Sequence, residues 1–187
     1  MIKALIFDYY DVMVDDIYWH AVVERAKSAD KWGELQAIQS GLNSGTLGWN
    51  LFCIKVGELM DVSPEVVAHE YQNIPLNTEL VDAIKAYKKR YSVALLSNAD
   101  RSQLEPQLKD RNIDTLFDYI GISSDFKLMK PQPELFKRFV ASMSLVPEQC
   151  VMIDDNPDNV AGAKEAGLLA IQFKTNEQLF AELEAIL

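Results

Sequence analysis

The chain begins with a short apolar segment that ends abruptly at a carboxylate, and this segment limits the possible folds more than any other. Residues 2–7 are apolar apart from Lys3, and Asp8 follows directly. A continuous apolar run of this length is typical of a strand buried on both faces of a parallel sheet. Ligands bind at the carboxyl ends of the strands in such sheets. The pattern therefore predicts an α/β fold with Asp8 at its functional edge.

Further apolar segments alternate with helical patterns from residue 78 onward. The predicted strands are residues 92–96, 119–122, 150–153 and 168–173, and the predicted helices are residues 78–90, 102–111, 133–142, 157–167 and 177–186. This alternation predicts βαβ units and a parallel sheet. Pro106 is expected to shorten the second helix, at whose start Asp100 and Gln103 form a weak capping-box match.

Between the first strand and these units lies a block of helical patterns without a convincing strand. The predicted helices are residues 18–29, 33–41, 47–60 and 64–71, with Ser63-Pro64 as N-cap and first turn of the last one. We predict that residues 1–16 and 76–187 form a Rossmann-like core and that residues 17–75 form an inserted helical cap. The crossings near residues 15–18 and 74–78 are hinge candidates.

Composition narrows the class of protein. The 187 residues are 49% hydrophobic, which is enough for one core with a modest insertion. A net charge of -10 argues against a nucleic-acid partner but not against a small anionic substrate, because a metal ion can reverse the sign of a cleft. Cys53 and Cys150 form no disulfide or metal pattern, and no segment resembles a membrane span or a signal peptide. We expect a soluble cytoplasmic protein.

Polar side chains follow several of the predicted strands. Asp8, Ser97 and the pair Asp154-Asp155 lie at strand ends, and Lys130 lies in a polar loop. The topology predicts that all of them face one crevice. There an aspartate can act as a nucleophile on a phosphoryl group, with its charge offset by a divalent cation between Asp8 and Asp155. Ser97 and Lys130 would hold the other oxygens of the transferred group.

Each of these residues also has an ordinary structural interpretation. Ser97 is equally typical of a turn or a helix cap. A carboxylate at Asp154 or Asp155 also favours the positive end of the helix that follows.

In the cap, Tyr18 and Trp19 lie close to the crossing and are candidates to line the entrance, whereas Phe52 is expected in the cap core. His20 lacks a ligand-spaced partner.

Four segments in order resemble the four motifs of the haloacid dehalogenase-like (HAD-like) hydrolase superfamily. These segments are Phe7–Val12, Leu95–Asn98, Lys130–Phe136 and Ile153–Val160. The helical block after the first motif resembles the small four-helix cap of one subgroup. The resemblance implies a Rossmann-like core that binds Mg²⁺ and, most commonly, hydrolysis of a small phosphate monoester through an aspartyl-phosphate.

The resemblance also implies a role for each matching residue. Asp8 would be the nucleophile and a metal ligand. The other implied roles are phosphate and intermediate stabilisation by Ser97 and Lys130, substrate binding by Ser97, Asn98 and Lys130, metal binding by Asp155 and by the main-chain carbonyl of Tyr10, and support by Asp154 and Asn159.

Tyr10 is the main departure from the phosphatase pattern. Phosphatases of the family have an acid/base Asp at this position, and loss of such a group costs about 10²–10⁴-fold in rate. The adjacent Asp11 is expected to point elsewhere. A Tyr here resembles the metal-independent 2-haloacid dehalogenases, but Asp11-Val12, Phe136 and Asp154-Asp155-Asn156 depart from that branch. Three hypotheses stay open, with the first favoured: a Mg²⁺-dependent phosphatase, a dehalogenase, and a catalytically silent binding protein.

Overall fold

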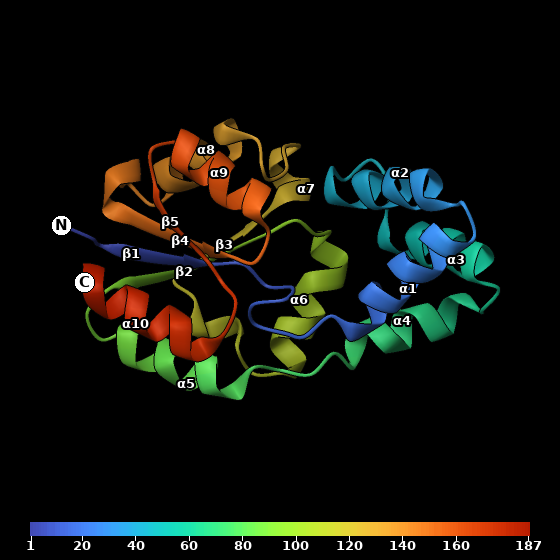
Figure 1. The fold of residues 1–187 in the computed structure, drawn as a ribbon, viewed down its shortest axis with the longest axis horizontal. Helices are drawn as coiled ribbons and strands as arrows, with labels where there is room; N and C mark the ends of the chain where they lie inside the picture. Colours follow the sequence, from blue (N-terminus) through green and yellow to red (C-terminus); the bar gives the residue numbers. More distant parts are fainter.

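The protein is built on a five-stranded parallel sheet with the strand order β3-β2-β1-β4-β5 (Figure 1). The computed structural model describes residues 1–187. The strands are β1 (Ala4–Phe7), β2 (Ser92–Ser97), β3 (Tyr119–Ile122), β4 (Cys150–Asp154) and β5 (Leu169–Gln172). The predicted α/β class with a Rossmann-like parallel sheet is confirmed. The first strand is the central one, so Asp8 leaves the sheet between two neighbours.

Helices cover both faces of the sheet. Alternate residues of β1 point to opposite sides, so apolar side chains on each face need their own covering layer. Leu5 and Phe7 belong to one buried cluster and Ala4 and Ile6 to another. The core helices are α5 (Thr78–Tyr87), α6 (Arg101–Asp110), α7 (Ser123–Phe126), α8 (Pro133–Ser142), α9 (Pro157–Glu165) and α10 (Asn176–Ile186). In Figure 1, α8 and α9 lie on one face of the sheet and α5 and α10 on the other.

The inserted block forms four helices beside the carboxyl ends of the strands (Figure 1). They are α1 (Ile17–Ser28), α2 (Trp32–Asn43), α3 (Trp49–Met60) and α4 (Pro64–Gln72). Trp49, Phe52 and Tyr71 pack ring against ring in their centre, with centroids 5.3–5.8 Å apart. The two crossings run side by side, since the Asp15 N–H donates to the Pro75 carbonyl at 3.0 Å. The domain boundary and the hinge stay predictions.

Several local expectations were wrong. α6 continues through Pro106 to Asp110, because four side chains on one face of the helix are buried and hold it in place: Gln103, Leu104, Gln107 and Leu108. Asp100 caps this helix through the Ser102 N–H, not through a capping box. The loop after β3 contains α7, and two short 3-10 helices cover Asp114–Leu116 and Pro147–Gln149. Ser63 and Pro64 occupy the N-cap and the first turn of α4 as predicted, although the Ser63 side chain makes no capping hydrogen bond. No helix combines the length and the apolar character that a membrane crossing requires.

Candidate active site

Strand register brings the predicted site residues to one edge of the sheet. Phe7 pairs with Leu95 on one side and with Ile153 on the other. The next residue on the central strand, Asp8, therefore lies level with Asp154, and its N–H donates to the Ile153 carbonyl at 2.9 Å. Ser97 ends β2 one residue further along. Residues that are 146 positions apart in the sequence thus meet for a purely topological reason.

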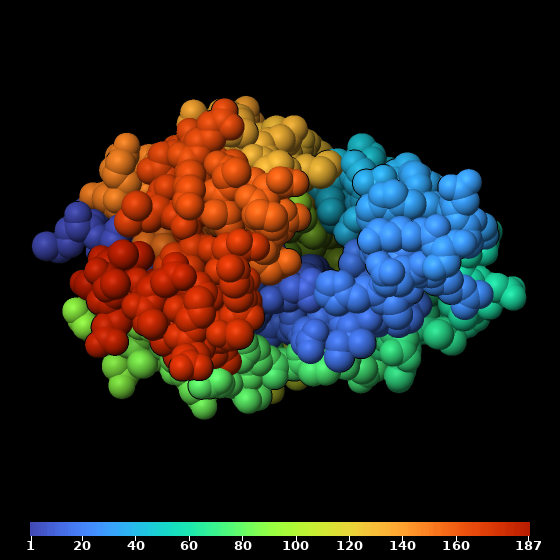
Figure 2. Space-filling view, viewed as in Figure 1, coloured from blue at the N-terminus to red at the C-terminus, as the bar shows by residue number.

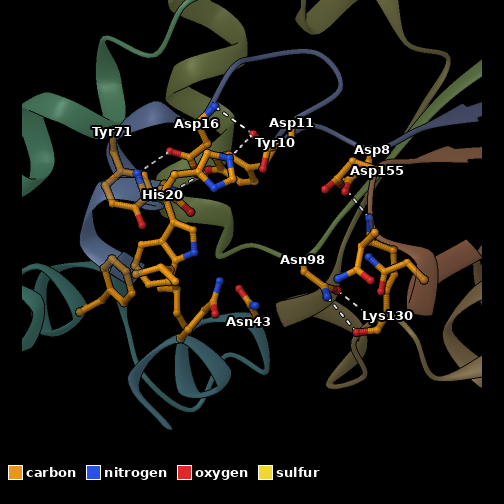
Figure 3. Close-up of a pocket in the computed structure, with 18 residues that line it drawn as sticks. Asp8, Tyr10, Asp11, Asp16, His20, Asn43, Tyr71, Asn98, Lys130 and Asp155 are labelled. Atoms are coloured by element: carbon orange, nitrogen blue, oxygen red, sulfur yellow. Dashed lines mark hydrogen bonds and ion pairs between the residues drawn. The ribbon is translucent and has the colours of Figure 1, made fainter. Parts of the chain in front are cut away.

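Lys130 is buried between the carboxylates of Asp8 and Asp154, and Figure 3 shows it beside Asp8. Its Nζ lies 2.7 Å from Asp8 Oδ1 and 2.6 Å from Asp154 Oδ2, and only 2% of the residue is exposed. Burial alone would lower the pKa of Lys130, but the charges of Asp154 and Asp8 raise it. The ammonium group therefore stays charged and aims at the strand ends, not into bulk solvent.

The main chain of Lys130 is fixed by Asn98. The Lys130 N–H donates to Asn98 Oδ1 at 2.8 Å, and Asn98 Nδ2 donates to the Lys130 carbonyl at 2.9 Å. On its other side this turn touches α9, where a Cβ on Gly162 would lie 2.0 Å from the Pro131 carbonyl oxygen. Only glycine permits that approach. Asn98 thus positions Lys130, a role that the sequence reading missed, and its contact with substrate stays a prediction.

Three carboxylates at this edge could hold one metal ion. Oxygen atoms of Asp8, Asp154 and Asp155 lie within 4.8 Å of one another. Burial raises the pKa of Asp8 although Lys130 opposes the shift, and burial together with Asp154 raises the pKa of Asp155 to about 6. Buried carboxylates that lack enough positive charge are suitable ligands for a hard divalent cation. The residues present therefore fit the Mg²⁺ ion that the sequence pattern implies.

The side chain of Asp154 is held by more hydrogen bonds than that of Asp155. Its Oδ1 accepts hydrogen bonds from Asn159 Nδ2 at 2.9 Å and from the Asn156 N–H at 3.0 Å, and its Oδ2 accepts from Lys130. Asp155 makes no side-chain hydrogen bond and lines the cavity. The Asp155 carboxylate is thus left without a hydrogen-bond partner, and the supporting roles of Asp154 and Asn159 and the metal-ligand role of Asp155 stay predictions.

Ser97 is fully buried, and its hydroxyl oxygen has no hydrogen-bond partner. A turn-capping or helix-capping serine would bond to a nearby main-chain group, so the structure argues against that interpretation. Unpaired buried hydroxyl groups are rare because each one costs free energy. Ser97 therefore has unused hydrogen-bonding capacity at the end of β2, one residue beyond the level of Asp8, but it is not among the residues that line the cavity.

Tyr10 and Asp11 both line the cavity, but neither reproduces the missing acid/base. The Tyr10 hydroxyl accepts a hydrogen bond from Gln103 Nε2 at 2.6 Å, and burial raises the pKa of this phenol well above its usual value. Asp11 has a φ of 57° and accepts from His20 Nε2 at 2.9 Å. Its side chain is thus turned toward the cap, although it still contributes to the raised pKa of Asp155.

A cavity of about 330 Å³ lies between the strand ends and the cap. Figure 2 shows the molecule hollowed at this junction, and Figure 3 shows side chains from both sides facing the space. The cap contributes Trp19, His20, Val23, Gln39, Leu42, Asn43, Phe52 and Tyr71, and Asp16, at the N-cap of α1, lies on the same side of the cavity. Trp19 lines the cavity as expected, whereas Tyr18, the other candidate for the entrance, does not. Gln39 and Asn43 were missed because helical periodicity does not show which face of a cap turns toward the core, and Asp16 was missed because it precedes the first cap helix.

A family model described as haloacid dehalogenase-like hydrolase matches residues 2–167 of the sequence. The chain belongs to the HAD-like hydrolases. The match includes all four motif segments, so membership and the hydrolase class follow together.

Curated relatives resemble the chain only in part. A pyrophosphatase PpaX from Bacillus cereus is 28% identical over 101 residues, which is 54% of this chain and 44% of the relative. A drimenol cyclase drtB from Aspergillus calidoustus is 24% identical over the whole chain but only 37% of its own length. The chain spans less than two thirds of these proteins.

Solved structures of HAD-like proteins share the fold. A HAD family enzyme from Bacteroides thetaiotaomicron, in complex with magnesium and inorganic phosphate, superposes with a TM-score of 0.75, 22% identity and coverage of 96% of this chain and 100% of that one. An L-2-haloacid dehalogenase from Xanthobacter autotrophicus superposes with a TM-score of 0.71, 18% identity and coverage of 100% and 84%. At these identities the likeness shows the fold alone.

Proposed function

We propose that the protein is a Mg²⁺-dependent phosphatase that acts on a small phosphate monoester. The observation that carries the proposal is the group of three carboxylates within 4.8 Å of one another beside the buried ammonium group of Lys130. An anionic nucleophile needs positive charge around it to approach an anionic phosphoryl group. Asp8, Asp155 and the main-chain carbonyl of Tyr10 would hold the ion, which supplies that charge when bound.

In this proposal Asp8 attacks the phosphorus atom, and the bond to the ester oxygen breaks. The leaving alkoxide takes a proton from solvent, and a water molecule then hydrolyses the aspartyl-phosphate to release inorganic phosphate and restore Asp8. Lys130 and the unpaired hydroxyl of Ser97 would stabilise the charge that develops on the phosphoryl oxygens. Magnesium and phosphate in the relative from B. thetaiotaomicron support the proposal.

Tyr10 supports a second candidate, a 2-haloacid dehalogenase, because a departing halide needs no proton. The position of Tyr10 is fixed by its hydrogen bond with Gln103. The acidic group at Asp154 and Asp155 supports the phosphatase instead, because it would repel an anionic haloacid unless a cation is bound.

The test is turnover of p-nitrophenyl phosphate with and without Mg²⁺. We expect activity that a chelator removes and that Asp8→Asn abolishes. The control variant Asp15→Asn, at an exposed position, should keep the activity. Release of chloride from 2-chloropropionate in the presence of chelator would instead establish the dehalogenase. If neither substrate reacts while Mg²⁺ still binds, the protein is a catalytically silent binding protein.

A further inference from the structure

The two sides of the cavity differ in charge. Lys130, on the core side, is the only lysine or arginine among the lining residues. The cap side presents the aromatic rings of Trp19, Phe52 and Tyr71, and its charged groups are acidic apart from His20. A substrate that places its phosphoryl group at Asp8 therefore extends its alcohol part toward aromatic faces and carboxylates.

Asp16 is the most unusual group on the cap side. Only 3% of the residue is exposed, yet it makes no ion pair with a lysine or an arginine. Its Oδ1 accepts the Trp19 N–H at 3.2 Å, while Oδ2 makes no hydrogen bond within the protein although the side chain lines the cavity. A buried carboxylate without a counter-charge is costly, so this oxygen has capacity left for a cationic ligand.

The groups around Asp16 do not supply that cation. His20 is the one basic side chain near Asp16 and lowers its pKa slightly, but its Nε2 contacts Asp11 Oδ1 at 2.9 Å and makes no contact with the Asp16 carboxylate. The Asp16 N–H also donates to Asp11 Oδ1, at 3.2 Å, which brings a second acid close. Tyr10 and Tyr71 face the same region with neutral phenols.

Aromatic rings complete the recognition site for a cation. Trp19 and Tyr71 have centroids 6.2 Å apart, and Phe52 lies 6.1 Å from Trp19 and 5.8 Å from Tyr71. The faces of such rings attract ammonium groups, most strongly where water is excluded. A second phosphate or a carboxylate in this place would instead meet Asp16 and Asp11 without any lysine or arginine to pair with.

We propose that the substrate is the phosphate ester of an amino alcohol, whose ammonium group lies beside the rings of Trp19 and Tyr71 and the carboxylate of Asp16. The proposal rests on the proposed phosphatase function and adds the chemical class of the leaving group. Burial raises the pKa of Asp16 to about 7, in keeping with a carboxylate that lacks a partner until a cation binds. The same charges disfavour pyrophosphate, the substrate named for the Bacillus relative.

The experiment compares choline phosphate with 3,3-dimethylbutyl phosphate, in which a carbon atom replaces the charged nitrogen, and with inorganic pyrophosphate. We expect kcat/KM for choline phosphate to exceed that of the neutral isostere by about 10-fold, and pyrophosphate to be the poorest substrate. Asp16→Asn should reduce the preference to less than about 3-fold, because Asn retains the helix cap but not the charge. The matched variant Asp15→Asn should retain the preference.

Equal use of the charged ester and its isostere, preference for pyrophosphate, or an unchanged preference in Asp16→Asn would overturn the inference. Turnover of p-nitrophenyl phosphate without a preference for the charged ester would support the phosphatase function and reject only the proposed substrate class. If no ester is hydrolysed, calorimetric titration of both ligands in the presence of Mg²⁺ decides, since a Kd ratio near one contradicts the proposed site.

Discussion

The core and cap sides of the cavity treat buried charge in opposite ways. On the core side Lys130 lies within 2.7 Å of both Asp8 and Asp154, and Asn159 completes the group with a further hydrogen bond. On the cap side Asp16 is equally buried but has only a main-chain partner. The core side is thus assembled before a substrate arrives, whereas the cap side leaves a charge unmatched. Under the proposed function, the sheet supplies the chemistry and the cap supplies the selectivity.

Removing the cation from the core side should have the largest effect. Lys130→Met leaves two carboxylates buried without their counter-charge, so the free energy of unfolding is expected to fall by about 3–5 kcal/mol. Urea denaturation of this variant measures the loss. Lys137→Met, at an exposed position on α8, should change stability by less than about 0.5 kcal/mol. Similar values for the two variants would mean that the core side is not held together by this ion pair.

Removing the charge of Asp16 should raise the free energy of unfolding, the opposite of the effect expected for Lys130→Met. The pKa of Asp16 is raised from 3.8 to about 7, so between these pH values the folded state binds more protons than the unfolded state, and stability falls as pH rises. Asp16→Asn removes this loss. We expect it to match the wild type near pH 4 and to be more stable by about 1–3 kcal/mol at pH 8, after allowance for solvent screening. Chemical denaturation across this range tests the prediction, and a destabilised Asp16→Asn at pH 8 would contradict it.

Tyr10 stands between the two sides, and its replacement tests whether the core side lacks only a proton donor. Tyr10→Asp supplies the missing acid/base, and we expect kcat for an alkyl phosphate, whose leaving alkoxide needs a proton, to rise by about 10-fold, at the modest end of what such groups contribute. Tyr10→Asn is the matched control, because asparagine has nearly the same shape as aspartate but no titratable proton. Equal rates for Asp and Asn would show that space, not proton transfer, limits the reaction.

The sequence predicted the core side far better than the cap side, for a physical reason. A strand end is fixed by parallel pairing, so the apolar runs before Asp8, Ser97 and Asp154 were sufficient to bring these residues together. Lys130 needed the family resemblance, since a loop lysine is otherwise solvated by default. The reciprocal bonds of Asn98 with the Lys130 main chain left no periodic signal in the sequence.

The cap was predictable as four helices but not as a surface. Periodicity found every end of α1 to α4 to within two residues, yet it did not show that Phe52, which was expected in the cap core, would line the cavity. Asp16 precedes α1 and therefore has no place in the helical periodicity. Its burial results from packing against residues distant in the sequence, including Tyr71, whose pKa is raised by burial and by the charge of Asp16.

Ser97 should show the smallest effect on stability and therefore distinguishes function from folding. Its hydroxyl has no partner, so Ser97→Ala is expected to leave the free energy of unfolding unchanged or to raise it by up to about 1 kcal/mol, while turnover of p-nitrophenyl phosphate falls. The matched variant Ser123→Ala loses a hydroxyl that donates to the Asn43 carbonyl and accepts the Ala99 N–H, and it should lose about 1 kcal/mol. Urea denaturation of both variants gives the comparison. A Ser97→Ala protein as destabilised as Ser123→Ala would mean that the Ser97 hydroxyl is a structural group. It would then not be available to bind a phosphoryl oxygen.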